Sequence, residues 1–266
     1  MITSTIHDVN SINLKNMSGF VETKLGNKLI MEDYHMIYKI DDNFYIFGIF
    51  DGHGGYSISK QLPSLIKKYI KEPFHLNIHN LLEICYLIDY ELYKLWHNNN
   101  NGGSTVLLVI YTTLKVIILH LGDTKAKCYT HDNMLLYETI DHNVSNVDEL
   151  DRIRENNDNI LTYINKIRIN NHLAVTRSIG DFQYKLTNSI YDGEKSVVIR
   201  IPEIKMIDTS ELRCIIMGSD GFWNISNSCM LDDIISNSEK QVQDKLHKWI
   251  QEDSSNDNIT MIGLYL

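Results

Sequence analysis

Three aspartates stand at the ends of apolar runs that read as strands. Asp51 follows Phe44–Phe50 and opens a glycine-rich turn that contains His53. Asp220 follows a second apolar run and forms another Asp-Gly pair, and Asp257 stands just before the apolar run at the C-terminus. One such aspartate is as readily an ordinary turn residue as a ligand. Three of them together predict an oxygen-ligand site for a hard divalent cation, Mg²⁺ or Mn²⁺.

The segments that must position these aspartates have clear patterns of apolar residues. Helices are expected at Ser57–Ile70, Ile78–Trp96, Val147–Asn156, Leu231–Ser236 and Glu239–Gln251. Strands are expected at Gly19–Leu25, His35–Ile40, Phe44–Phe50, Ser104–Tyr111, Lys115–Leu121, Ala126–Thr130 and Val197–Ile207, the last interrupted by Pro202. Short turns join the three strands from Ser104 to Thr130, which predicts a β-meander and a largely antiparallel sheet. On these patterns alone the fold class is α+β.

Size and composition indicate one large folded domain. The 266 residues are 43% hydrophobic and 22% charged, and the net charge of −9 argues against a nucleic-acid partner. The first residues do not resemble a signal peptide, and no apolar run approaches membrane-spanning length, so no membrane partner is expected. An intracellular, cytoplasmic location is the expectation, with the thiols of Cys85, Cys128 and Cys214 in the core. Residues 1–18 are expected to form a loose N-terminal arm.

Seven motifs follow one another in the order found in a known family. The motifs are GNKLIMED at Gly26–Asp33, DGHGG at Asp51–Gly55, GGST at Gly102–Thr105, GDTK at Gly122–Lys125, LAVTRSIGD at Leu173–Asp181, SDGFW at Ser219–Trp223 and DNIT at Asp257–Thr260. In these motifs the chain resembles the metal-dependent protein Ser/Thr phosphatases of type 2C, the PPM family, from about Gly19 to its C-terminus, and 19–266 is therefore expected to be a type 2C-like domain.

This resemblance implies a fold and a reaction. The fold would be a four-layer α/β/β/α sandwich, with two largely antiparallel sheets flanked by helices. The reaction would be hydrolysis of phosphoserine and phosphothreonine in proteins by a metal-bridging hydroxide. Asp51 would bridge two Mg²⁺ or Mn²⁺ ions, the Gly52 carbonyl would complete one ion, and Asp220 and Asp257 would hold the other. His53 is the candidate general acid that protonates the leaving alkoxide.

For several other residues of the motifs, two roles are compatible with the sequence. Glu32 and Asp33 are either solvated turn carboxylates or side chains that orient metal-bound waters, and the resemblance favours the second reading. Asp123 is either a turn former or the ligand of a third, weaker metal ion. Arg177 and Asp181 could pair within their own segment, in a supporting role. Gln183–Ser196 has little periodicity and is expected to form a mobile flap beside the site.

Three positions depart from the pattern of the family. The phosphate-binding arginine is replaced by Lys28, which keeps the charge but cannot make two-pronged hydrogen bonds. Lys125 replaces a second arginine, and Asn224 stands where an aspartate is common. We expect weaker phosphate binding, not loss of activity, because the three metal aspartates are unchanged.

Two rival functions remain to be weighed. The chain could be a pseudophosphatase that keeps the fold only to present a binding surface, although Asp51, Asp220 and Asp257 all remain. It could also be a metal-dependent phosphohydrolase that acts on small molecules. Phosphorylated proteins are the expected partners and a monomer the expected state. Turnover of a phosphopeptide compared with a small phosphate ester separates the three functions.

Overall fold

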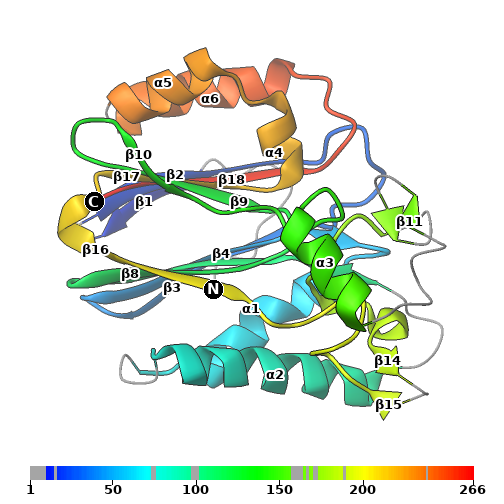
Figure 1. Cartoon of the computed structure of the whole chain (residues 1–266). Helices are drawn as coiled ribbons and strands as arrows, with labels where there is room; N and C mark the ends of the chain where they lie inside the picture. The colour runs from blue at the N-terminus through cyan, green and yellow to red at the C-terminus, as the bar shows by residue number, and fades with distance from the viewer. Residues whose placement is uncertain are drawn as a thin grey trace.

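Two antiparallel sheets lie face to face, and helices cover the outer face of each, so that the molecule has four layers (Figure 1). The computed structural model describes residues 10–14, 17–72, 76–96, 102–156, 164–165, 168–169, 173–187, 190–237 and 239–266. The predicted α+β class and the α/β/β/α sandwich are confirmed. None of the helices in these ranges is both long and apolar enough to cross a membrane.

The first sheet has six strands in the order β1-β2-β18-β17-β9-β10. Their bounds are Asn10–Leu14 for β1, Met17–Lys24 for β2, Ile259–Tyr265 for β18, Cys214–Gly218 for β17, Lys125–Tyr129 for β9 and Leu135–Glu138 for β10. The helices α5 (Ser228–Ser236) and α6 (Glu239–Glu252) cover its outer face (Figure 1). Ile234 and Leu246 from these helices pack in one buried cluster with Ile216 of β17 and Met261 of β18.

The second sheet has five strands in the order β16-β8-β7-β4-β3. Their bounds are Glu203–Asp208 for β16, Lys115–Leu121 for β8, Val106–Thr112 for β7, Phe44–Phe50 for β4 and Tyr34–Asp41 for β3. The helices α1 (Ser57–Tyr69) and α2 (Ile78–Leu95) cover its outer face (Figure 1). Pro63 lies inside α1, which continues for six residues beyond it.

The strand β4 shows how the sequence builds the core. Phe44, Ile46 and Phe50 pack against the helices α1 and α2, and the alternate residues Tyr45 and Phe47 pack between the two sheets. Side chains of a strand alternate between its two faces, and here both faces are buried. A strand buried on both faces needs an unbroken apolar run, which is why this segment shows no polar alternation.

The prediction of a three-strand meander is wrong for its third strand, β9. The strands β7 and β8 do pair, but β9 belongs to the other sheet, where it pairs with β17 and β10. The chain crosses from one sheet to the other at Gly122, whose φ of 103° favours glycine. A Cβ atom at Gly122 would also lie 2.5 Å from the side chain of Thr105. This crossing carries Asp123.

Three further expectations need correction. The arm expected to be loose includes β1, which pairs with β2 along Asn10–Leu14, and residues 1–9 lie outside the described ranges. The strand expected at Ser104–Tyr111 is divided, because Ser104 belongs to the short strand β6 (Gly103–Ser104) and β7 begins only at Val106. The Asp-Gly pair at Asp220 does not form a simple turn, because Asp220 begins the helix α4 (Asp220–Ile225).

Short elements surround the end of the sandwich where β4 stops. The strand β6 lies between β5 (Gly52–His53) and β13 (Ile179–Gly180). The helix α3 spans Val147–Asn156, as expected. Two small hairpins follow: β11 (Ile164–Asn165) with β12 (Arg168–Ile169), and β14 (Leu186–Thr187) with β15 (Ile190–Tyr191). The thiols expected in the core, Cys85, Cys128 and Cys214, are buried and free.

Candidate active site

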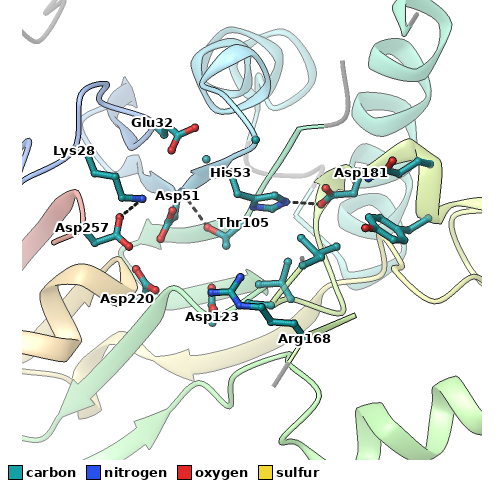
Figure 2. Close-up of a pocket in the computed structure, with 17 residues that line it drawn as sticks. Lys28, Glu32, Asp51, His53, Thr105, Asp123, Arg168, Asp181, Asp220 and Asp257 are labelled. Carbon is teal, nitrogen blue, oxygen red and sulfur yellow. Dashed lines mark hydrogen bonds and ion pairs between the residues drawn. The ribbon is translucent and has the colours of Figure 1, made fainter. Parts of the chain in front are cut away.

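Five aspartates from distant parts of the chain line one cavity of about 380 Å³, and four of them, all except Asp181, form one group (Figure 2). Asp51 directly follows β4 in one sheet, whereas Asp220 and Asp257 stand near the ends of β17 and β18 in the other. Because β17 and β18 are antiparallel neighbours, with Gly218 opposite Met261, the end of one lies beside the start of the other. Asp123 joins this group because it lies in the crossing between the sheets.

Close backbone contacts around the aspartates leave room only for glycine at two positions. A Cβ atom at Gly52 would lie 2.5 Å from the hydroxyl oxygen of Ser59 and 2.6 Å from the carbonyl oxygen of Glu32. A Cβ atom at Gly221 would lie 2.0 Å from the carbonyl oxygen of Asn258. The Asp-Gly pairs therefore let the chain segments that carry the carboxylates approach one another closely.

The carboxylates of the cavity repel one another strongly. Burial and the neighbouring carboxylates hold the pKa of Asp51 well above its usual range, and the same causes raise the pKa of Asp220. Burial and the charge of Asp220 raise the pKa of Asp123 to about 7. Groups in this state lack a compensating positive charge, and a bound divalent cation supplies one.

Glu32 and Asp33 take different positions beside the aspartates. Glu32 lines the cavity, and its carboxylate accepts a hydrogen bond of 2.7 Å from the Gly55 N–H. Asp33 is buried beside the cavity, not in its lining, and its Oδ2 atom has no hydrogen-bond partner among the described residues. Burial raises the pKa of Asp33 to about 7. Asp33 is only 4% exposed and so is not a solvated turn carboxylate, whereas Glu32 is partly exposed and is held by the Gly55 N–H.

His53 contacts the carboxylate of Asp181 directly, at one side of the cavity (Figure 2). The Nε2 atom of His53 lies 2.7 Å from Oδ2 of Asp181, and the hydroxyl of Ser178 donates to the same oxygen at 2.6 Å. Burial alone would lower the pKa of His53, but the charge and hydrogen bond of Asp181 reverse that effect and raise it. This shift favours the protonated, proton-donating form of the imidazole.

The expected pair of Arg177 and Asp181 does not form. Arg177 instead pairs with the buried carboxylate of Glu149 on α3, which leaves Asp181 to contact His53. Asp181 has a positive φ of 50° and donates its backbone N–H to the carbonyl of Gly102 at 3.1 Å. This backbone geometry turns the carboxylate toward the cavity.

Two cationic side chains enter the cavity from opposite ends. The ammonium of Lys28 lies 2.8 Å from Oδ1 of Asp257, and Arg168 of β12 reaches in beside Asp123 (Figure 2). The sequence patterns gave no reason to select Arg168. Its backbone position is fixed by the next residue, Ile169, which is buried and exchanges two backbone hydrogen bonds with Leu173.

Thr105 and Asp181 are further residues that the sequence patterns did not assign to the site. The hydroxyl of Thr105 accepts the N–H of Asp51 at 3.0 Å, and the Thr105 N–H donates to the Asp51 carbonyl at 2.9 Å. These two bonds fix the direction in which the chain leaves β4. The motif GGST contains Thr105, so a signal was present, but its role depends on a partner 54 residues earlier.

A buried ion pair anchors the segment expected to be a mobile flap. Lys185 and Asp89 of α2 are both fully buried, with 2.9 Å between the ammonium and each carboxylate oxygen. Asp89 also accepts hydrogen bonds from the Gly180 N–H and the Tyr191 hydroxyl, at 2.8 and 2.6 Å. The segment that follows Asp181 is thus tied to the helix layer at several points.

The donor set of the cavity fits hard divalent cations. All its anionic groups are carboxylates, and an unpartnered buried oxygen of Asp33 lies next to them. Oxygen donors suit Mg²⁺ and Mn²⁺, and among the residues that the structure describes neither a cysteine nor a second histidine lines the cavity.

Comparison with known proteins identifies the family. The family model described as "Protein phosphatase 2C" matches residues 16–259. A curated relative, "Protein phosphatase 1L" from Bos taurus, is 29% identical over 67% of this chain and 51% of its own length. "Protein phosphatase 2C homolog 1" from Saccharomyces cerevisiae is 25% identical over 89% of this chain and 88% of its own. A solved serine-threonine phosphatase 2C from Toxoplasma gondii shares the fold, with a TM-score of 0.72, 18% identity and 99% coverage of both chains.

Fold, site and comparisons together define a protein serine/threonine phosphatase. More particularly, the chain belongs to the protein phosphatase 2C family, because the family model matches most of its length. Enzymes of this family depend on Mg²⁺ or Mn²⁺.

Proposed function

We propose that this chain hydrolyses phosphoserine and phosphothreonine in proteins at the cavity between Lys28 and Asp181. The observation that carries the proposal is the meeting of Asp51, Asp220 and Asp257 with His53 in one cavity. Carboxylates from both sheets reach it, and a protonated imidazole stands at its side. This arrangement combines a cation site with a proton donor, the two components that hydrolysis of a phosphate monoester needs.

We assign the cation ligands as follows. Asp51 would contact two ions, the carbonyl oxygen of Gly52 would complete one, and Asp220 and Asp257 would hold the other. Asp123 would hold a third, weaker ion, since its carboxylate lines the same cavity. Glu32 and Asp33 would orient waters around the ions. When bound, the ions supply an activated water and neutralise charge on the phosphoryl oxygens.

His53 has the role of general acid in this proposal. A Ser or Thr alkoxide is a strong base and needs a proton as it leaves. The carboxylate of Asp181 supports this role, because it raises the pKa of His53 and occupies Nε2, so that Nδ1 is the nitrogen that would donate its proton to the leaving oxygen. Asp181 itself does not touch the substrate in this scheme, so we assign it as a positioning residue.

Lys28 and Arg168 are the cationic side chains that we assign to the phosphate. Lys28 replaces an arginine of the family, and a lysine ammonium acts as a point charge. Arg168 offers a guanidinium, which can hold two phosphate oxygens at once, from the other end of the cavity. Together they would balance the charge of a phosphate that enters between carboxylates.

The decisive experiment measures phosphate release from a phosphothreonine peptide with Mn²⁺ and with Mg²⁺, next to release from a small sugar phosphate. We expect turnover of the peptide in preference to the small ester, and none in the variant that combines Asp51→Asn and Asp220→Asn. Binding of the peptide without release of phosphate would instead identify a pseudophosphatase. Preference for the small ester would identify a small-molecule phosphohydrolase.

A further inference from the structure

Two histidines and a glutamate form a second cluster outside the active-site cavity. His120 of β8 lies directly opposite Glu203 of β16 in the antiparallel register, and the ring of His142 stacks on that of His120 with 4.6 Å between centroids. Each of the three offers one donor atom, and these atoms lie within 4.8 Å of one another. His120 shares its strand face with Ile118, which packs between the sheets. The cluster therefore lies at the edge of the inter-sheet core.

One residue of this cluster, His120, lacks the partners that buried groups normally have. His120 is only 1% exposed, and neither of its ring nitrogens has a hydrogen-bond partner of normal geometry among the described residues, although the Thr124 backbone lies close enough to affect its pKa. A buried polar atom without a partner destabilises the fold, so a histidine left in this state needs an explanation. A bound ion between the three side chains supplies one.

The spacing within the cluster suits a shared ion better than a direct contact. The Nε2 atom of His142 lies 3.6 Å from Oε2 of Glu203, which is long for a hydrogen bond. Ligand atoms around a tetrahedral zinc ion, at bond lengths of 2.0–2.2 Å, stand about 3.4 Å apart. The gap between His142 and Glu203 is close to that value.

We propose that His120, His142 and Glu203 form a binding site for a transition-metal ion of the zinc class, distinct from the oxygen-ligand site of the cavity. Two imidazoles and one carboxylate are a donor set that Zn²⁺ favours, and one further position remains for water. Mg²⁺ prefers oxygen ligands alone, so the two sites would select different metals. Glu203, whose side chain is 37% exposed, provides the route from solvent.

The surroundings prepare the cluster for an ion. Burial and the neighbouring His142 ring hold the pKa of His120 well below its usual value, and burial lowers the pKa of His142, so both rings are neutral, as ligands must be. The Tyr137 hydroxyl donates to Oε1 of Glu203 at 2.9 Å and leaves Oε2 facing His142. Contacts of this kind orient the ligands of metal ions.

Two contacts must change when the ion binds. The two imidazoles must turn out of their near-parallel stack, because an ion lies in the plane of each ring that holds it. The Gly122 N–H faces Nδ1 of His142 at 3.3 Å, which places the ring proton on Nε2, toward Glu203. An ion at Nε2 moves that proton to Nδ1 and ends the contact with Gly122. At 3.3 Å this contact is long and weak, and ligand bonds to a transition metal outweigh it. The change gives the site a spectroscopic signature, a tautomer switch at His142.

The test measures zinc bound per chain in the variant Asp51→Asn/Asp220→Asn, which lacks the competing carboxylate site. After gel filtration in excess Mg²⁺, we expect about one Zn²⁺ per chain, and Co²⁺ in its place should give the visible absorption bands of a four-coordinate ion. Adding His120→Asn or Glu203→Gln to this variant should remove both the zinc and the absorption bands. The control is Asp208→Asn, on the strand β16 that carries Glu203, and it should remove neither. Nitrogen-15 spectra should report the tautomer switch.

A third variant keeps the test informative if His120→Asn fails to fold. Tyr137→Phe removes only the hydroxyl that orients Glu203, and loss of such a contact typically weakens metal binding about 10–100-fold. Two results would overturn the proposal and leave bound water as the partner of His120. One is absence of zinc from the Asp51→Asn/Asp220→Asn variant, and the other is an unchanged zinc content after Glu203→Gln is added to it. Neither result depends on phosphatase activity, so the outcome is independent of the proposed function.

Discussion

Nε2 of His53 lies 2.7 Å from Oδ2 of Asp181, a buried carboxylate 128 positions further along the chain. His53 belongs to β5 and Asp181 directly follows β13, and both strands pair with β6 between them. The three-stranded arrangement therefore fixes the distance between the two side chains. The carboxylate raises the pKa of His53 against the opposing effect of burial.

Replacement of Asp181 should change the pH dependence of the reaction. In Asp181→Asn the charge is lost, only the weaker effects of Asp123 and Glu32 still oppose burial, and the pKa of His53 falls. A general acid works only while it is protonated, so kcat/KM declines as pH rises through that pKa. We expect the alkaline limb of the profile to move to lower pH and turnover at neutral pH to fall about 10- to 100-fold, as loss of a charged hydrogen bond predicts. Asp192→Asn, on the neighbouring segment, should leave the profile unchanged.

Replacement of His53 should matter in proportion to the basicity of the leaving group. A Ser or Thr alkoxide needs a proton as it departs, whereas nitrophenolate leaves well without one. His53→Ala should reduce phosphopeptide turnover by about 10²–10⁴-fold and affect p-nitrophenyl phosphate much less. Both substrates are measured on one preparation, so that the fraction of active enzyme is the same for both and cancels in the comparison. Equal losses on the two substrates would mean that His53 has a structural role.

The metal aspartates should be needed for activity but not for folding. Asp51→Asn, Asp220→Asn and Asp257→Asn should each abolish Mn²⁺-dependent turnover. In EDTA, Asp51→Asn should unfold at a temperature at least as high as the parent, because the raised pKa of Asp51 marks a carboxylate that burial and its neighbours destabilise. Thermal melting checks the prediction about stability, and phosphate release checks the prediction about activity. A parent that stays fully active in EDTA would contradict the metal assignment.

The strand ends were predictable because they leave a local pattern. An apolar run that stops at an Asp-Gly pair marks both the strand β4 and the position of Asp51, and the same holds for β17 and Asp220. The start of β18 after Asp257 was equally clear. Each of these statements needs only neighbouring residues, and the resemblance to a family then indicated that the ends meet.

Pairing between distant segments left no such pattern. Nothing near Asp181 in sequence indicates His53 as its partner, and the choice between Glu149 and Asp181 as the partner of Arg177 depends on where α3 packs. The crossing between the sheets at Gly122 was not predicted, because the sequence of a short turn is similar whether it joins two strands of one sheet or strands of two sheets. Arg168 was missed because a lone arginine in a polar stretch is usually solvated.

The position of Lys28 makes its substitution informative in two directions. Lys28→Arg should lower KM for phosphopeptide, because a guanidinium can hold two phosphate oxygens and each charged hydrogen bond contributes about 1.5–3 kcal/mol. In Lys28→Met, KM should rise while the Mn²⁺ concentration for half-maximal activity falls, because the ammonium that contacts Asp257 at 2.8 Å no longer competes with the ion.

Arg168 provides the control for these variants. If both cations bind the phosphate, Lys28→Arg should recover part of the affinity that Arg168→Ala loses. An unchanged or raised KM in Lys28→Arg would mean that Lys28 does not face the phosphate. An unchanged Mn²⁺ requirement in Lys28→Met would mean that the contact with Asp257 does not hinder the ion.

Glu149 should be the carboxylate on α3 whose loss most weakens the fold. It is 1% exposed and accepts hydrogen bonds from Arg177, from Arg152 at 3.1 Å and from the Thr176 hydroxyl at 2.6 Å. Glu149→Gln leaves two partly buried arginines without their anion, and breaking a buried ion pair typically costs about 3–5 kcal/mol. Urea unfolding should show a loss of that size. Asp151→Asn removes an exposed pair with Arg154 from the same helix and should cost less than about 1 kcal/mol.

The pH dependence of stability gives an independent check on Glu149. Burial alone would raise its pKa, but hydrogen bonds and charge from Arg177 lower it to about 2 from an ordinary value of 4.5. A group whose pKa is lower in the folded state stabilises the protein above its ordinary pKa and loses that contribution as pH falls. The parent should therefore lose stability between about pH 4.5 and pH 2 more steeply than Glu149→Gln, once both are measured in urea with the active-site metals removed. Parallel plots of stability against pH for the two proteins would mean that the arginines do not lower the pKa of Glu149. Apolar packing of α3 would then hold the 173–181 segment in place of the contacts of Glu149 with Thr176 and Arg177.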